Sequence, residues 1–159
     1  MDELARDVGQ RLKAANASLV TAESCTGGWA AQVVTSVAGS SEWFERGFVV
    51  YSNAAKLELL GVRAETLQRQ GAVSEQTAAE MALGALVRSK ASIALAITGV
   101  AGPGGGSPDK PVGTVCFAWA RSGGWVSSET LHLAGDRESV RRRSVVHALQ
   151  GVLKALDGG

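Results

Sequence analysis

Apolar residues recur at two spacings along the chain, and each spacing predicts one kind of element. Leu4, Val8 and Leu12 stand four residues apart, which is typical of one face of an amphipathic helix. Helical spacing returns at about 27–37, 54–61, 74–90 and 136–156. Ser74 and Asp136 begin the last two segments, where their side-chain oxygens can accept amide hydrogens of the first turn. The pattern predicts a helix in each of these segments.

Short apolar runs between the helical segments predict strands. They lie at about 18–24, 47–53, 92–99, 112–120 and 125–134. The run at 92–99 is apolar at nearly every position, as expected of a strand that helices cover on both faces. The stretch between residues 100 and 113 is rich in Gly and Pro and predicts a loop.

The order of these elements predicts the fold class. Helices connect the first three strands, so these strands should be parallel with right-handed crossovers. The fourth strand follows a loop without a helix and precedes a tight turn, so it should run antiparallel to both neighbours. We expect an α/β fold, a three-layer α/β/α sandwich with a mixed five-stranded sheet, in a single domain spanning residues 1–159.

This topology predicts where a ligand binds. In open α/β sheets, ligands bind beyond the carboxyl ends of the parallel strands. The start of the antiparallel fourth strand and the end of the fifth share that edge. The polar or glycine-containing clusters expected there are Glu23–Ser24, Tyr51–Asn53, Thr98–Gly99, Gly113–Thr114 and Gly135–Arg137. Segments far apart in the sequence should therefore form one site.

The stretch "TAESCTGG" at 21–28 has two interpretations. Ser24 or Thr26 could cap the following helix, with Gly27 allowing the helix to pack closely on the sheet. The same position also suits chemistry, because a hydroxyl at a helix start lies among amide donors that can stabilise an oxyanion or a phosphate. The sequence leaves both interpretations open.

Lys56 is the candidate for activating a serine. Cys25 could also be a nucleophile, but His132 and His147 are predicted on a strand and inside the last helix, where structural roles are expected. A lysine can act as the base when burial lowers its pKa. The alternative for Lys56 is a solvated helix lysine, although its predicted place beside the site favours function.

The glycine-rich loop and the start of the last helix suggest binding of an anion. Gly102–Gly106 lack the spacing of a phosphate-binding P-loop, but glycines let the backbone approach a ligand closely. Arg137 and Arg141 share a helix face, and positive charge there opposes the helix dipole. The alternative for the glycines is a flexible loop, and the alternative for the arginines is a solvated basic face. For the arginines, binding of a phosphate or carboxylate is favoured.

Composition and charge exclude several classes of protein. Hydrophobic residues make up 45% and charged residues 19% of the 159 positions, as in ordinary globular proteins. A formal net charge of +1 gives no bias toward nucleic acid or anionic lipid, and no apolar run approaches the ~20 residues of a membrane span. Two distant cysteines are no disulfide framework and favour a reducing, cytoplasmic setting.

Several blocks of sequence resemble the CinA C-terminal domain family, in particular its stand-alone bacterial nicotinamide mononucleotide deamidases. The resemblance extends from about residue 5 to residue 155. It rests on "TAESCTGGW", "GSSEWFERGFVVYSNAAK", "GAVSEQT", "ITGVAGPGGGSPDKPVGTV" and "GDRESVRRR". The family implies hydrolysis of nicotinamide mononucleotide to nicotinic acid mononucleotide and ammonia, in pyridine-nucleotide (NAD) salvage. It also implies a serine–lysine dyad without metal or cofactor, and a homodimer.

The resemblance implies roles for named residues. Lys56 would be the general base, and the nucleophile would be Ser24 or Ser41. The topology favours Ser24, while Ser41 precedes the second strand and could contribute across a dimer interface. Tyr51 and Thr98 would orient the amide or support the dyad. The implied substrate-binding residues are Thr26, Gly27, Gly99, Gly102, Gly104, Gly105, Thr114, Arg137 and Arg141.

Two other functions use the same predicted edge. A nucleotide-binding or regulatory module would need the glycine loop and the arginines but no activated serine. A competence- or DNA-damage-associated accessory protein is suggested by the family's name, but the low net charge and the lack of a long basic stripe count against it.

Overall fold

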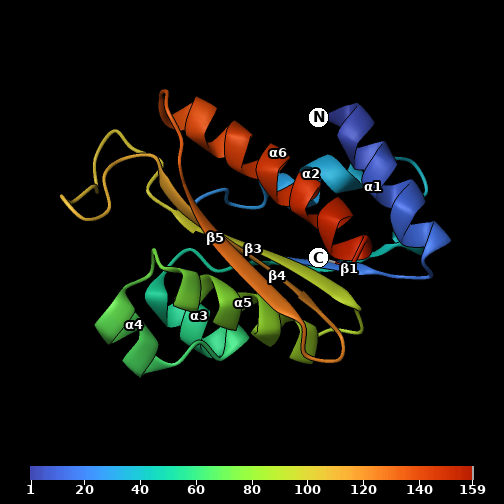
Figure 1. Ribbon diagram of the computed structural model, residues 1–159, viewed down its shortest axis with the longest axis horizontal. Helices are drawn as coiled ribbons and strands as arrows, with labels where there is room; N and C mark the ends of the chain where they lie inside the picture. The colour runs from blue at the N-terminus through green and yellow to red at the C-terminus, as the bar shows by residue number, and fades with distance from the viewer. Residues whose placement is uncertain (159) are drawn as a thin grey trace.

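A computed structural model describes residues 1–158 and contains the expected sheet (Figure 1). The strands lie in the order β2-β1-β3-β4-β5. β1 is parallel to β2 and to β3, whereas β4 is antiparallel to both of its neighbours, as predicted. The bounds are Leu19–Glu23 for β1, Phe44–Val49 for β2, Ile93–Gly99 for β3, Thr114–Arg121 for β4 and Val126–His132 for β5.

Helices cover both faces of the sheet, which confirms the three layers. Figure 1 shows α1, α2 and α6 on one face and α3, α4 and α5 on the other. The bounds are Asp2–Ala14 for α1, Trp29–Thr35 for α2, Asn53–Leu60 for α3, Ala64–Gln70 for α4, Glu75–Val87 for α5 and Arg137–Leu156 for α6, with a 3₁₀ turn, η1, at Ser40–Glu42. Over residues 1–158, no helix is long and apolar enough to cross a membrane.

Local sequence explains where several helices begin. Ser74 accepts a hydrogen bond from the amide of Thr77, and Asp136 accepts one from the amide of Ser139. These bonds satisfy amides that have no partner within the helix. The cap of α3 is Ser52, which accepts from the amide of Ala55.

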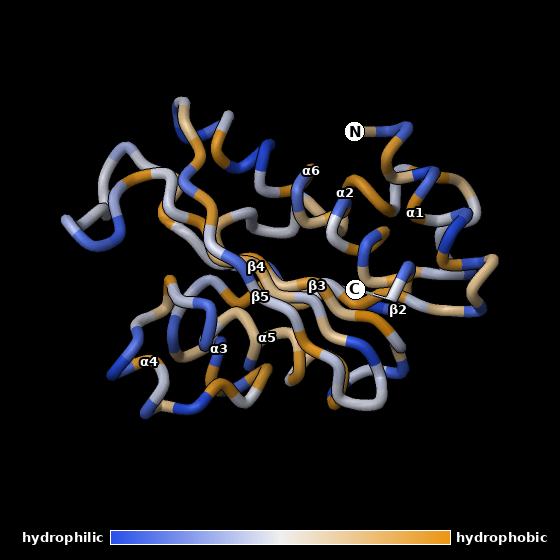
Figure 2. Tube along the Cα trace, in the orientation of Figure 1, coloured by the Kyte–Doolittle hydropathy of each residue, from blue (hydrophilic) through white to orange (hydrophobic). Residues whose placement is uncertain are grey.

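The core lies on both sides of β3 and β4. Figure 2 shows the apolar, orange stretches of these strands between the two layers of helices. On the side of α3 and α5 the buried residues are mostly small, so the layers approach closely. A Cβ added at Gly84 of α5 would lie 1.9 Å from the carbonyl oxygen of Leu60, so glycine is required at this crossing.

Three elements differ from the sequence prediction. β2 begins at Phe44 and not at Gly47, because the charged Glu45 and Arg46 lie on an edge strand and break the apolar run. α4 was not predicted, since its seven residues are mostly polar. α2 begins at Trp29, and Gly28 in the left-handed conformation (φ 101°) precedes it, so neither Ser24 nor Thr26 caps it.

A buried hydroxyl without a partner gives a prediction about stability. Thr21 is fully buried in β1, and among the described residues its Oγ1 forms no hydrogen bond. Such a group costs stability. We expect Thr21→Val to raise the free energy of unfolding by about 1 kcal/mol and the Tm by about 2–4 °C in a thermal melt.

The matched control is Thr77→Val. Thr77 is also fully buried, but its Oγ1 donates to the carbonyl oxygen of Gly71 over 2.7 Å. This substitution should lower the Tm, because it removes the shorter of the two hydroxyl hydrogen bonds to that carbonyl, the other coming from Ser74. A lower Tm for Thr21→Val would contradict the assignment of a costly hydroxyl.

Candidate active site

A cavity of about 300 Å³ opens beyond the carboxyl ends of β1 and β3. Its lining comes from the ends of these strands, the segment after β2, the turn before α5, the glycine-rich loop and the start of α6. The candidate residues from the sequence that line it are Ser24, Tyr51, Lys56, Thr98, Gly99, Gly102, Gly104, Gly105 and Arg137. The sheet edge expected from topology therefore carries a cavity.

Lys56 and Ser24 are in direct contact. The Lys56 Nζ lies 3.0 Å from the Ser24 Oγ, although 31 residues separate the two in sequence. The same Nζ donates to the carbonyl oxygens of Val50 at 3.1 Å and Tyr51 at 3.3 Å. Lys56 is only 1% exposed and Ser24 only 7%. A neutral amine that donates to both carbonyls has its lone pair left for the serine hydroxyl.

Burial makes the neutral form of Lys56 accessible. It lowers the pKa of the amine below its ordinary value of 10.5, because a charged group is poorly solvated there. Only the Cys25 thiolate would act in the opposite direction, and burial raises the pKa of that thiol to about 11. Cys25 is therefore neutral near pH 7. Within residues 1–158, Lys56 forms no ion pair that would hold its proton.

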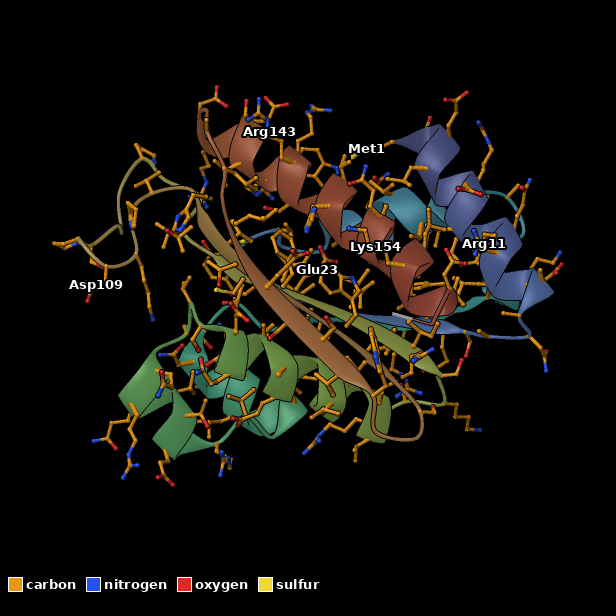
Figure 3. All side chains as sticks on the ribbon, in the orientation of Figure 1. Met1, Arg11, Glu23, Asp109, Arg143 and Lys154 are labelled. Atoms are coloured by element: carbon orange, nitrogen blue, oxygen red, sulfur yellow. The ribbon has the colours of Figure 1, made fainter. Side chains whose placement is uncertain are left out.

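Glu23, immediately before Ser24, was expected at this edge, but its structural role was not predicted from the sequence. Figure 3 shows it in the middle of the molecule, and its side chain is fully buried. The carboxylate accepts from the Thr26 hydroxyl at 2.7 Å and from the amides of Ala30 at 2.8 Å and Ala31 at 3.1 Å. The expectation that amides at the start of α2 serve an oxyanion is therefore wrong for these two amides. The sequence feature that could have indicated this role is a single carboxylate at the end of an otherwise largely apolar strand.

Arg137 and Tyr51 form one wall of the cavity. The Arg137 Nη1 donates to the carbonyl oxygen of Gly102 over 2.8 Å, and Nη2 donates to the Tyr51 hydroxyl over 3.4 Å. The guanidinium has five donor hydrogens, so others remain for a ligand. The Thr98 hydroxyl donates to the carbonyl oxygen of Ala72 and so connects β3 to the turn before α5. Tyr51 is 63% exposed, which leaves its ring accessible.

Five candidate residues do not line this cavity. Thr26 bonds to Glu23, and Arg141 bonds to the carbonyl oxygens of Cys25 and Thr26. Gly27 lies in the same turn, where Arg141 is the nearest neighbour of a Cβ added there. Thr114 contacts His132 and Pro111 in a separate hollow. Ser41 is exposed in η1, before β2 and near the opposite edge of the sheet.

The two histidines take no part in the cavity. His147 of α6 bonds to Glu129 and packs against Phe117 and Trp119. His132 lies at the end of β5, beside Thr114. A histidine-activated Cys25 is therefore excluded by position as well as by the raised pKa of the thiol. Over residues 1–158, no cluster of three or more His, Cys, Asp or Glu side chains could hold a metal ion.

The cavity also contains residues to which the sequence analysis gave no role in the site. Asn53 begins α3, one turn before Lys56, and lines the cavity with it. The sequence placed Asn53 in the cluster Tyr51–Asn53 at this edge, but its spacing of three residues from Lys56 was not used. The other lining residues are Cys25, already considered as a nucleophile, and Ala72, Val73, Val100 and Ala101.

Comparison with known proteins gives consistent matches over nearly the whole chain. The family described as the CinA C-terminal domain matches residues 1–156. "Nicotinamide-nucleotide amidohydrolase PncC" of Escherichia coli (strain K12) is 55% identical over 93% of this chain and 90% of its own length. The protein of the same name from Enterobacter agglomerans is 51% identical over 97% and 94%. The crystal structure of the competence/damage inducible protein CihA from Agrobacterium tumefaciens superposes with a TM-score of 0.94 at 47% identity, covering 98% of this chain and 94% of that one.

Proposed function

Because the chain belongs to the CinA C-terminal domain family, we propose that it hydrolyses the carboxamide of nicotinamide mononucleotide with a Ser24–Lys56 dyad. The products are nicotinic acid mononucleotide and ammonia. The nicotinamide-nucleotide amidohydrolase class of activity follows from relatives that match the chain over almost their full length. The observation that carries the mechanism is the buried 3.0 Å contact between the Lys56 Nζ and the Ser24 Oγ.

The first half of the reaction forms an ester on Ser24. Neutral Lys56 takes the hydroxyl proton while Oγ attacks the carboxamide carbon. The carbonyl oxygens of Val50 and Tyr51 hold the resulting ammonium through two of its hydrogens. The third hydrogen passes to the departing nitrogen, the C–N bond breaks, and ammonia leaves.

The second half regenerates the dyad. Lys56 is neutral again and takes a proton from water, whose oxygen attacks the ester carbon. The proton then returns to Oγ as the ester bond breaks, and the acid product gives its own proton to solvent and leaves as a carboxylate. Lys56 thus serves as base and acid in turn, which suits a group whose pKa burial has lowered.

The remaining polar groups of the cavity suit a nucleotide. Arg137 offers free guanidinium donors to the 5′-phosphate, and the glycine loop at 102–105 offers backbone. Tyr51 and Thr98 orient the amide or support the dyad. The class of substrate, a mononucleotide, fits a cavity of this size.

The domain organisation, pathway, oligomeric state and compartment are parts of the same proposal. The chain acts as one domain over residues 1–159, in pyridine-nucleotide salvage, as a homodimer in the reducing cytoplasm. Its two free buried cysteines suit that compartment. A non-catalytic nucleotide-binding protein and a competence- or DNA-damage-associated accessory protein are the alternatives. The lysine aimed at a buried serine favours the enzyme, since binding alone needs no such pair.

Ammonia release tests the proposal. Wild-type protein should release ammonia from nicotinamide mononucleotide, with nicotinic acid mononucleotide as the second product by mass spectrometry. The logarithm of kcat/KM should rise with pH while Lys56 loses its proton and should level off below pH 10.5, because burial lowers its pKa. No ammonia from the folded protein would refute the function. A profile with the midpoint of an ordinary lysine would refute the proposed base.

A further inference from the structure

We infer that Arg141 is a positioning residue, which holds the turn after Ser24 so that the amide of Cys25, a residue that lines the cavity, receives the carboxamide oxygen as it becomes negative. This inference rests on the proposed function and names an oxyanion donor of that site. It also gives Arg141 a role other than the phosphate contact predicted from the sequence. The evidence is the set of hydrogen bonds on three consecutive carbonyl groups.

Each carbonyl of the turn has a donor. The Ser24 carbonyl oxygen accepts from the amide of Gly27 at 3.0 Å. The Arg141 Nε donates to the Cys25 carbonyl oxygen at 3.0 Å, and its Nη2 donates to the Thr26 carbonyl oxygen at 3.2 Å. One guanidinium therefore binds two successive carbonyl groups, a forked geometry that lysine cannot reproduce.

The orientation of the amides follows from these carbonyl contacts. In a planar trans peptide, the N–H points opposite to the C=O of the preceding residue. The Cys25 amide therefore points away from the Gly27 donor, and the Thr26 amide points away from Arg141. In the part of the chain that the structure describes, neither amide donates to an acceptor. Because Cys25 lines the cavity and Thr26 is fully buried, the Cys25 amide is the donor left for an oxyanion beside Ser24.

Other amides near Ser24 are already engaged. The amide of Ser24 donates to the carbonyl oxygen of Ile97 at 2.9 Å, and Glu23 accepts from Ala30 and Ala31. Glu23 also holds the Thr26 hydroxyl, so it fixes the turn from the side of α2 while Arg141 fixes it from α6. Both charged groups therefore act on the turn and not on the substrate.

Arg141 is itself held in place. Its guanidinium lies 5.4 Å from the centre of the Trp29 ring, and Arg142 lies 5.3 Å from the same ring. The Arg141 side chain does not line the cavity, whereas Arg137, one turn earlier, does. A charged donor on a carbonyl also polarises the peptide and makes its N–H a stronger donor. Removing Arg141 should therefore weaken stabilisation of the transition state more than binding of the ground state.

Steady-state kinetics of Arg141→Gln and Arg141→Lys test this role. Both variants should lose about 10- to 100-fold in kcat, somewhat less than the loss of an oxyanion donor, with KM within about threefold of wild type. Arg137→Gln should instead raise KM and have a smaller effect on kcat, because Arg137 contacts the bound nucleotide in the proposed function. The matched control is Arg142→Gln, which removes an exposed arginine paired with Glu138 and should leave both constants unchanged. Active sites are counted by binding of nicotinic acid mononucleotide, so partial unfolding lowers the count and not kcat.

A second measurement isolates the oxyanion. The mononucleotide carrying an aldehyde in place of the carboxamide adds the Ser24 Oγ to its carbonyl carbon, and the carbonyl oxygen then occupies the oxyanion position. Arg141→Gln should weaken its inhibition about 10-fold or more while leaving the affinity for the acid product unchanged. A raised KM with normal kcat, or equal effects on aldehyde and product, would overturn the inference. If wild type itself releases no ammonia, the proposed function fails instead.

Discussion

Lys56→Met is expected to lower kcat for ammonia release by about 10³-fold or more, while the protein stays folded. Methionine keeps an unbranched side chain of similar length but has no lone pair of amine nitrogen to accept the Ser24 proton. The substitution removes a buried amine whose solvation was already poor, which offsets the loss of its hydrogen bonds to Val50 and Tyr51. The measurements are single-turnover ammonia release and a thermal melt.

The matched control for Lys56→Met is Lys90→Met. Lys90 is exposed after α5, its amide donates to Glu45, and it does not line the cavity. Its substitution should therefore change neither kcat nor KM. The residual activity of Lys56→Met should also lose the rise with pH, because the group that titrates is gone. Near-normal turnover by Lys56→Met would refute the dyad even if the protein released ammonia as proposed.

Ser24→Ala is expected to abolish the acyl-enzyme as well as turnover. Oγ forms the ester, so rapid quenching and intact-protein mass spectrometry should show the nicotinate-mononucleotide adduct on wild type and none on Ser24→Ala. The loss in kcat should match that of Lys56→Met, and the double variant should be no worse than either one. Residues that act as a unit are strongly non-additive in this way.

Ser41→Ala is the comparison that decides between the two serines. In the structure Ser41 is exposed in η1, before β2, whereas Ser24 contacts the Lys56 Nζ. The adduct should therefore persist in Ser41→Ala. An adduct on Ser24→Ala together with none on Ser41→Ala would assign the attack to Ser41, supplied by a second subunit.

The sequence predicted those parts of the fold that depend on local pattern. β1 and β3 are largely apolar, and Ser74 and Asp136 carry their own capping oxygens, so these elements were found where they lie. β2 was displaced, because an edge strand tolerates Glu45 and Arg46, and the apolar pattern weakens there.

Some residues of the candidate site could likewise be predicted from the sequence, and others could not. Ser24, Lys56 and Arg137 were identified because each follows the end of a strand, and topology alone brings such positions together. The contacts of Glu23 and Arg141 could not be predicted, since they depend on the turn at 24–28 and on how α6 packs against it. Gly27 and Gly28 have positive φ angles, so the turn does not continue as the helix that the spacing suggested.

The position of β2 at the edge of the sheet has a consequence for how firmly the two halves of the dyad are held. Ser24 follows β1, which pairs on both sides, whereas the carbonyl groups that hold the Lys56 amine follow β2, which pairs on one side only. Edge elements open at a lower free-energy cost than central ones. Mild denaturant should therefore free and protonate the base while the nucleophile remains in place, so the protein inactivates before it unfolds.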